Sequence, residues 1–184
     1  MSGRFLALTL HMTMIVTLTV GFSEALAQNP PNGPARAAQE DAIREAVLRY
    51  QMEGWARDGD KSEAEAQDAN DKAIAKRLNA RVYYLSVNRK DPSEELLKRF
   101  RDFPRTIKKV SESTHTKRLW VADKKTKQPG IIFSADEIHW ITDDQVEVDG
   151  GYYCGGLCAA GDVFTVNFDH GTWKVTKAVM KWIS

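Results

Sequence analysis

Two cysteines, separated by three residues, are the most specific chemical feature of this sequence. Cys154 and Cys158 flank Gly155, Gly156 and Leu157. A three-residue turn at this point would bring the two thiols across from each other, within reach of a disulfide. If the chain instead stays extended through Leu157 and turns at residues 160–162, the two Cα atoms lie about 13 Å apart, beyond the reach of a bridge. The sequence leaves both geometries open.

The two thiols do not predict a redox centre or a metal centre. Their C-x-x-x-C spacing differs from the C-x-x-C arrangement of disulfide oxidoreductases, and no helix start that would activate a thiol is expected beside them. A metal site would need further ligands, which the neighbouring residues do not supply. A disulfide that closes so short a loop would stabilise the fold by roughly 2 kcal/mol.

The best catalytic group that the sequence offers combines Asp136 and His139 with Tyr83 or Tyr152 across a pocket. A carboxylate or imidazole base with tyrosine donors can perform general acid–base catalysis if burial tunes the base. Asp136 and His139 are three residues apart, however, so a regular strand would direct them to opposite faces. We therefore predict surface or hydrogen-bonded histidines and no catalytic residue.

Composition and motifs indicate one domain without a recognisable cofactor. The chain has 184 residues, 42% of them hydrophobic, and a net charge of +1, which suits a single soluble globular domain. It contains no G-x-S-x-G, H-E-x-x-H, P-loop or G-x-G-x-x-G pattern. No cofactor and no metal is therefore expected.

Charge is distributed unevenly along the chain. Residues 105–127 contain eight basic side chains against two acids, whereas residues 131–173 contain eight acids and no lysine or arginine. The favoured interpretation is complementary charge across neighbouring strands, together with lysines that protect a sheet edge. The alternative is a polarised surface that docks a charged partner or an anionic envelope polymer. Its candidate partner surface is the loop that contains Lys124, Lys125 and Lys127.

The first 27 residues have the pattern of a secretory signal peptide. Arg4 precedes an apolar stretch from Phe5 to Phe22, and Ala25-Leu26-Ala27 supplies small residues for cleavage before Gln28. The alternative is an uncleaved membrane anchor, but a histidine and four threonines weaken the stretch. We expect a periplasmic or secreted bacterial protein without a transmembrane segment in the mature chain. Export argues against a nucleic-acid partner.

Residues 28–38 are rich in proline and predict a flexible segment, followed by one domain over residues 39–184. Apolar spacing predicts a first helix over about 38–57, ended by Asp58-Gly59-Asp60. A capping box of Ser62 and Glu65 would start a second helix that runs to about Asn79. A third helix should start at residues 91–94, with Leu96, Phe100 and Phe103 buried, and end at Pro104.

Alternating apolar residues predict strands on both sides of that third helix. Residues 81–87 are apolar on both faces, so this strand should be covered on both. Later strands are expected at 107–111, 119–122, 131–141, 145–153, 163–168 and 173–182. In the last of these the apolar phase shifts by one residue, which predicts a β-bulge near Thr176 and Lys177. Trp140, Trp173 and Trp182 fall in strand registers where core packing is expected.

Helices followed by a meander predict an α+β domain, in which N-terminal helices pack on a curved antiparallel sheet. The segments VEVDGGYY, GGLCAAG, HGTWKV and MKWIS resemble a group of small exported bacterial proteins of unknown function. The layout is also similar to the NTF2-like and cystatin-like superfolds, in which helices pack into the concavity of a bent sheet. The resemblance spans most of the mature chain in order of elements, and its specific segments lie within residues 82–100 and 131–184. It implies a fold and a compartment but no activity, because NTF2-like domains include isomerases, dehydratases, ligand carriers and interaction modules.

The sequence therefore favours a noncatalytic exported module that binds a protein partner or a small ligand in the cell envelope. Two alternatives stay open: a small NTF2-like enzyme that acts on a hydrophobic molecule, and a secreted inhibitor or immunity protein. A homodimer through the sheet face is a further possibility for the partner.

Overall fold

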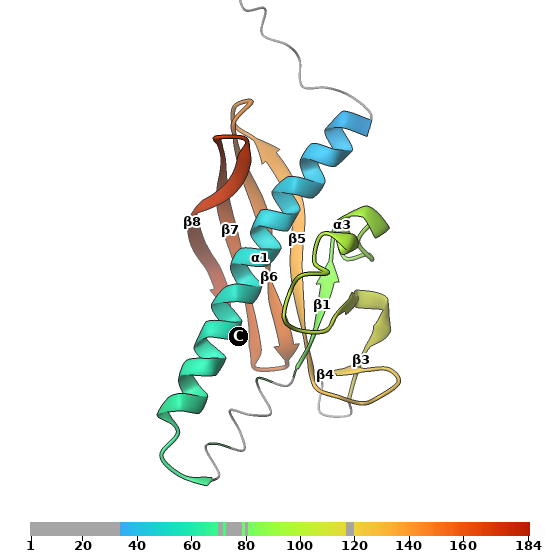
Figure 1. Ribbon diagram of the computed structural model, residues 1–184, viewed down its shortest axis with the longest axis vertical. Helices are drawn as coiled ribbons and strands as arrows, with labels where there is room; N and C mark the ends of the chain where they lie inside the picture. Colours follow the sequence, from blue (N-terminus) through green and yellow to red (C-terminus); the bar gives the residue numbers. More distant parts are fainter. Residues whose placement is uncertain (1–33, 70–71, 73–78, 80, 117–119) are drawn as a thin grey trace, which may run out of the picture.

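The computed structural model describes residues 34–69, 72, 79, 81–116 and 120–184 of the chain. Within these residues one long helix lies across one face of a sheet (Figure 1). The helical elements are α1 (Pro34–Glu65), α3 (Glu94–Lys98) and the 3-10 helix η1 (Val110–Glu112). The strands are β1 (Val82–Ser86), β2 (Ile107–Lys109), β3 (Ser113–His115), β4 (Val121–Asp123), β5 (Gly130–Trp140), β6 (Gln145–Gly155), β7 (Cys158–Asp169) and β8 (Thr172–Ile183).

The sheet is mixed, with strand order β2-β1-β5-β6-β7-β8, and β3 pairs with β4 separately. β5 to β8 form the predicted antiparallel meander, but β1 pairs in parallel with both β2 and β5. The α+β class is confirmed, and the expectation of a wholly antiparallel sheet is wrong. Parallel pairing arises because long connections return the chain to its starting end: α3 precedes β2, and η1, β3 and β4 precede β5.

α1 covers the inner face of the sheet, which we define by the buried residues Phe133, Val148 and Phe164. The opposite side is the outer face. The apolar stripe of α1 is fully buried against the inner face, and each such side chain contributes about 1.5–3 kcal/mol to stability. Its members are Ile43, Val47, Leu48 and Met52. The helix thus holds the meander together along one side only.

α1 is longer at both ends than the sequence predicted. It continues through Asp58-Gly59-Asp60 to Glu65, so the predicted helix end and the predicted capping box at Ser62 are wrong. A glycine inside a helix costs about 1 kcal/mol relative to alanine, which the helix-forming residues 61–65 can offset. At its other end α1 begins at Pro34, so residues 34–38 are helical, and proline is well tolerated in a first turn. Of the predicted second helix, residues 62–65 belong to α1, residues 66–68 are not helical, and residues 70–71 and 73–78 lie outside the described residues.

The third predicted helix is confirmed at its start and is shorter than expected. The Ser93 hydroxyl accepts a hydrogen bond from the Leu96 N–H at 3.0 Å, which caps α3. The helix ends at Lys98, and Phe100 in the following turn is buried together with Leu96. No helix in the described part of the chain is long and apolar enough to cross a lipid bilayer.

β1 is buried on both faces, as its sequence predicted. Tyr83 and Leu85 join the core beneath α1, whereas Val82 and Tyr84 pack with Val121 of β4 on the outer face. The β3–β4 ribbon therefore covers the outer face near β1. It leaves the outer face of β6, β7 and β8 accessible further along the sheet.

Register shifts interrupt the meander at four points of the described strands, one of them at Cys154 of β6 beside the hairpin turn. In β8, Val175 pairs with Val166 and Lys177 with Thr165, which leaves Thr176 as the extra residue and confirms the predicted bulge. A second bulge in β8 occurs at Lys181, and a third in β5 occurs at Asp136 and Glu137. Each bulge changes which side chains reach the outer face.

Asp123 is a buried charge that ties β4 to β1 and β2. Its Oδ2 accepts hydrogen bonds from the Tyr84 hydroxyl at 3.0 Å and from the Lys108 ammonium at 2.6 Å. Its Oδ1 accepts from the N–H groups of Lys125 and Thr126, at 2.8 Å each. The hydrogen bond from Lys108 is the main reason that the pKa of Asp123 lies well below its usual range. Burial, followed by the contact with Asp123, raises the pKa of Tyr84.

We expect the stability that Asp123 provides to be lost in acid. Because its pKa is lower in the folded than in the unfolded chain, the carboxylate stabilises the fold above about pH 4, and this stabilisation is lost as the pH falls towards the folded-state pKa. Asp123→Asn should therefore melt at a lower temperature than the wild type at neutral pH. The difference between the two melting temperatures should narrow in acid. Thermal unfolding followed by circular dichroism from pH 7 to about pH 3 measures this.

Asp143→Asn is the matched control, since Asp143 is exposed in the β5–β6 turn. The assignment of a buried, charged Asp123 would be contradicted if the difference in melting temperature between Asp123→Asn and the wild type did not change with pH. It would also be contradicted if Asp143→Asn showed the same difference.

Candidate functional site

A pocket of about 500 Å³ lies on the outer face, where β5 to β8 run side by side. Arg89, in the turn after β1, contributes to one side, and Lys181 and Trp182 at the end of β8 contribute to the other. Small-molecule sites commonly have volumes of about 300–1,000 Å³. We call this cavity the outer-face pocket.

Glycines form part of the floor of the outer-face pocket. Gly151 of β6 pairs with Gly161 of β7, and Gly150 lies beside them. A Cβ atom at Gly161 would overlap the indole of Trp182, and one at Gly151 would overlap the Ala160 carbonyl oxygen. Only glycine fits at these two positions, because the indole and the neighbouring strand already occupy the space that a side chain would need.

Trp182 is 55% exposed, so the expectation that it packs in the core is wrong. The bulge at Lys181 places Trp182 opposite Gly161, on the outer face and away from α1. Trp173 is buried and Trp140 is partly buried against the core, as expected. Because of this bulge, Trp182 lines the pocket and does not pack in the core.

Charged groups of both signs line the pocket. Arg89 and Lys181 are the cations, and Asp136, Asp149 and Asp162 are the carboxylates. Asn88 and Arg89 both have positive φ, at 50° and 61°, within a tight turn that two hydrogen bonds between Val87 and Lys90 close. Asp136 Oδ1 is buried without a hydrogen-bond partner among the described residues. An acceptor of this kind favours a ligand that brings a donor.

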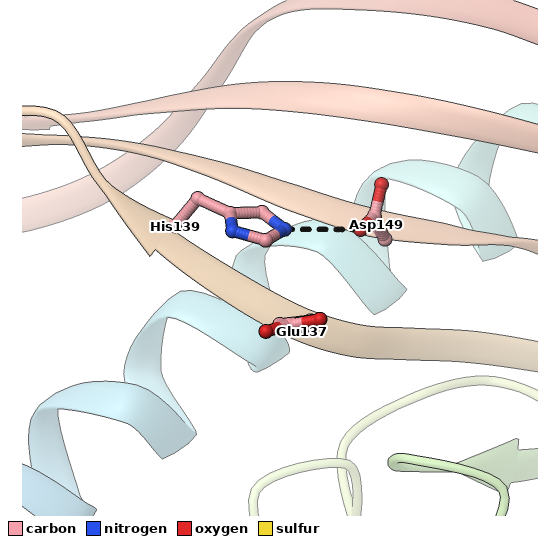
Figure 2. A group of neighbouring side chains, drawn as sticks. All are labelled: Glu137, His139 and Asp149. Atoms are coloured by element: carbon pink, nitrogen blue, oxygen red, sulfur yellow. Dashed lines mark hydrogen bonds and ion pairs between the residues drawn. The ribbon is translucent and has the colours of Figure 1, made fainter.

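Next to the pocket lies a group that we call the His139 cluster, formed by Glu137, His139 and Asp149 (Figure 2). His139 Nε2 lies 3.1 Å from Asp149 Oδ2, and both side chains are about half exposed. The hydrogen bond with Asp149, more than the charge of the nearby Glu137, raises the pKa of His139. Asp149 belongs to both the cluster and the pocket.

The structure does not bring the four predicted pocket residues together. Tyr83 is buried near Phe133, with ring centroids 5.0 Å apart, and Tyr152 contacts Trp55 beneath α1. Both tyrosine rings therefore lie on the inner face, and Tyr152 also contributes, like Asp136, to the lining of the outer-face pocket. Asp136 and His139 share the outer face, because the β5 bulge reverses the alternation that would have separated them. The nearest partner of His139 is Asp149, which the sequence reasoning did not select.

Cys154 and Cys158 form a disulfide, with Cα atoms 5.3 Å apart. The hairpin turns at Gly156 and Leu157, and Gly155 pairs with Cys158. Of the two predicted geometries, the short turn is confirmed and the turn at residues 160–162 is wrong. Disulfides are typical of proteins that fold in an oxidising compartment.

The predicted partner surface lies in the connection between β4 and β5. Lys124, Lys125 and Lys127 are all exposed. The Lys124 ammonium donates to the Ser111 carbonyl, and the Lys127 ammonium donates to the Lys124 carbonyl at 2.7 Å. These contacts give the lysines a role in holding the turn. A docking role for the loop stays a prediction.

A second pocket, of about 670 Å³, lies between α1 and the β7–β8 turn. Its charged residues already satisfy one another: Glu45 accepts hydrogen bonds from both Arg49 and Arg99, at 2.9 Å each. The outer-face pocket, by contrast, contains the unpartnered oxygen of Asp136. We therefore take the outer-face pocket as the candidate site.

Sequence reasoning missed Arg89, Gly161, Lys181 and Trp182 as site residues. One signal was available, because the apolar phase in β5 changes from Phe133 and Ala135 to Ile138 and Trp140, as it also does in β8. That change marks the bulge that brings Asp136 and His139 to one face. The approach of Arg89 to the pocket depends on the packing of β1 beside β5, for which the sequence carries no local signal.

Comparison with known protein families, with curated proteins and with solved structures finds no match to this chain. The chemistry of the site therefore has to be argued from its own geometry.

Replacement of both cysteines should lower the free energy of unfolding. We expect the Cys154→Ser/Cys158→Ser variant to lose roughly 2 kcal/mol, because the bridge closes a short loop and restricts the unfolded chain only modestly. Urea unfolding of the wild type and the variant measures the loss. Reduced wild-type protein, which should behave like the variant, is the control. Two alkylatable thiols in unreduced protein would contradict the disulfide.

Proposed function

We propose that this protein is a noncatalytic binding module that holds a small polyhydroxylated ligand, of the size of a sugar, in the outer-face pocket. The observation that carries this proposal is the glycine floor beside an exposed indole, formed by Gly151, Gly161 and Trp182. Because Gly161 has no side chain, the indole of Trp182 packs directly on this strand, and more than half of the Trp182 surface stays exposed. An exposed indole offers an apolar face for stacking and a polar edge for hydrogen bonds.

The polar groups of the pocket support a hydroxylated ligand. Arg89 and Lys181 donate hydrogen bonds, and Asp136 and Asp149 accept them. A sugar hydroxyl can do both, so one kind of ligand group could satisfy cations and carboxylates together. A uniformly charged polymer fits less well, because half of these groups would repel it.

The arrangement supports binding more than catalysis. The tyrosines that were candidate proton donors, Tyr83 and Tyr152, lie on the opposite face of the sheet from His139. Burial raises the pKa of Asp162, which also lines the pocket, but its register with Gly150 directs its side chain towards the inner face. A base and a donor on opposite faces cannot act on one substrate.

An exported, envelope location is part of the same proposal. The disulfide supports an oxidising compartment, and the signal-peptide pattern of the sequence agrees with it. We also propose a layout related to the cystatin-like and NTF2-like superfolds, supported by the long helix that crosses the β5–β8 meander (Figure 1).

Removal of the exposed indole should weaken ligand binding without unfolding the protein. We expect Trp182→Ala to lower the affinity for the best sugar of a mono- and oligosaccharide panel by roughly fivefold to tenfold, because a stacking surface is lost. Chemical-shift perturbation in NMR titrations of labelled protein measures the affinity and should map onto Gly150, Gly151 and Gly161.

Trp120→Ala is the matched control, because Trp120 is also exposed, at 45%, but packs against Gly155 outside the pocket. A panel that causes no perturbation, or perturbations that respond equally to both variants, would reject the pocket as the binding site.

A protein partner is the second candidate, because β8 lies at one edge of the described sheet and the residues near its end expose apolar side chains. These are Val179, Met180, Trp182 and Ile183. An edge strand can accept a further strand. Lys174, Lys177 and Lys181 on the same strand disfavour pairing of two copies, since antiparallel β8 strands would bring like charges together.

The homodimer through the sheet face stays a prediction, and such an interface would cover the outer-face pocket. Light scattering at increasing protein concentration tests it, and a dimer should appear only if burial of the exposed β8 side chains outweighs the repulsion of the lysines. A mass that stays monomeric into the high micromolar range would exclude a stable dimer.

A further inference from the structure

We propose that the His139 cluster binds a divalent transition-metal ion, with Zn²⁺ as the best fit. Glu137, His139 and Asp149 each offer one ligand atom, and these atoms all lie within 4.8 Å of one another (Figure 2). Nothing else in the proposed function requires this ion, and the inference stands independently of it.

The pairing of β5 with β6 accounts for the convergence. His139 pairs with Glu147, so Asp149 lies two residues further along the same face of β6. The bulge at Asp136 and Glu137 lies opposite Asp149 and presents Glu137 to it. Two adjacent strands therefore deliver three ligands without any long loop.

The distances agree with a metal site that closes by small side-chain rotations. Ligand atoms bound to one zinc at about 2.0–2.2 Å lie up to about 4 Å apart. His139 Nε2 and Asp149 Oδ2 are already 3.1 Å apart, and the side chains of both are about half exposed, so they have room to adjust. The backbone need not move.

The donor set selects among metals. One imidazole and two carboxylates suit zinc and related first-row ions, whereas Ca²⁺ prefers six to eight oxygen ligands and Mg²⁺ retains most of its waters. Residues 131–173 contain no lysine or arginine, so no cation on β5, β6 or β7 competes for the carboxylates. Glu147, which pairs with His139, adds negative charge nearby.

Three protein ligands leave a coordination position open, which is the arrangement of zinc sites that also bind water or a ligand. Asp149 lines the outer-face pocket, and so does Asp136 with its unpartnered Oδ1. Asp149 thus joins the cluster to a pocket in which a buried carboxylate oxygen has no partner among the described residues. That oxygen is an observation separate from the cluster, and it favours a bound donor or cation in the pocket.

Calorimetric titration of untagged, chelator-treated protein with ZnCl₂ tests the site. We expect one equivalent to bind, with affinity reduced at least about tenfold in His139→Ala and in Asp149→Asn. His170→Ala is the matched control, because His170 is exposed in the β7–β8 turn outside the cluster, and its affinity should equal that of the wild type. Thermal unfolding of each variant without metal checks that the fold is retained, as expected for substitutions at half-exposed positions.

Titration with MgCl₂ and CaCl₂ should show binding at least about tenfold weaker than with ZnCl₂, because the imidazole favours the transition metal. The absence of zinc binding in the wild type would overturn the proposal. So would an equal loss of affinity in His139→Ala and His170→Ala, which would indicate scattered binding to surface histidines. No sugar takes part in these titrations. The absence of zinc binding would therefore not count against the proposed sugar pocket, which the NMR titrations with Trp182→Ala test separately.

Discussion

The packing of α1 against the inner face of the sheet is the contact on which the rest of this structure depends. The stripe from Ile43 to Met52 is fully buried against strands that are distant in sequence. Because the described core lies mainly on this side, the outer face of β6 to β8 does not have to be apolar for the protein to fold. That freedom permits glycines, carboxylates and a half-exposed tryptophan to occupy the outer face of the sheet.

β-Bulges turn this free face into a site. The bulge in β5 brings Asp136 to the same side as His139, and the bulge at Lys181 brings Trp182 over Gly161. In a regular strand, either Asp136 or His139 would point towards the core, and so would the indole of Trp182. The core face keeps its apolar residues in register around each bulge, so the polar arrangement is obtained without loss of packing.

Local patterns in the sequence were sufficient for the features that depend on neighbouring residues. The β5–β8 meander, the bulge at Thr176 and the start of α3 within residues 91–94 follow from alternation, phase and residue type. Features that depend on distant contacts were not predictable in this way. Gly59 is a typical helix end, yet α1 continues past it, and nothing in β1 itself specifies two parallel neighbours. The site was missed for the same reason, because Arg89 and Trp182 meet the pocket from elements almost a hundred residues apart.

The disulfide has a consequence for how rigid the outer face is. It joins β6 to β7 at their shared turn, and these two strands carry the paired glycines Gly151 and Gly161. Glycine-rich strands are weakly specified in register and tend to slip. A covalent link at one end of the hairpin limits sliding, so the flexibility that glycine brings is confined to local adjustment. A pocket floor held in register in this way would lower the entropy lost on binding of the ligand that we propose.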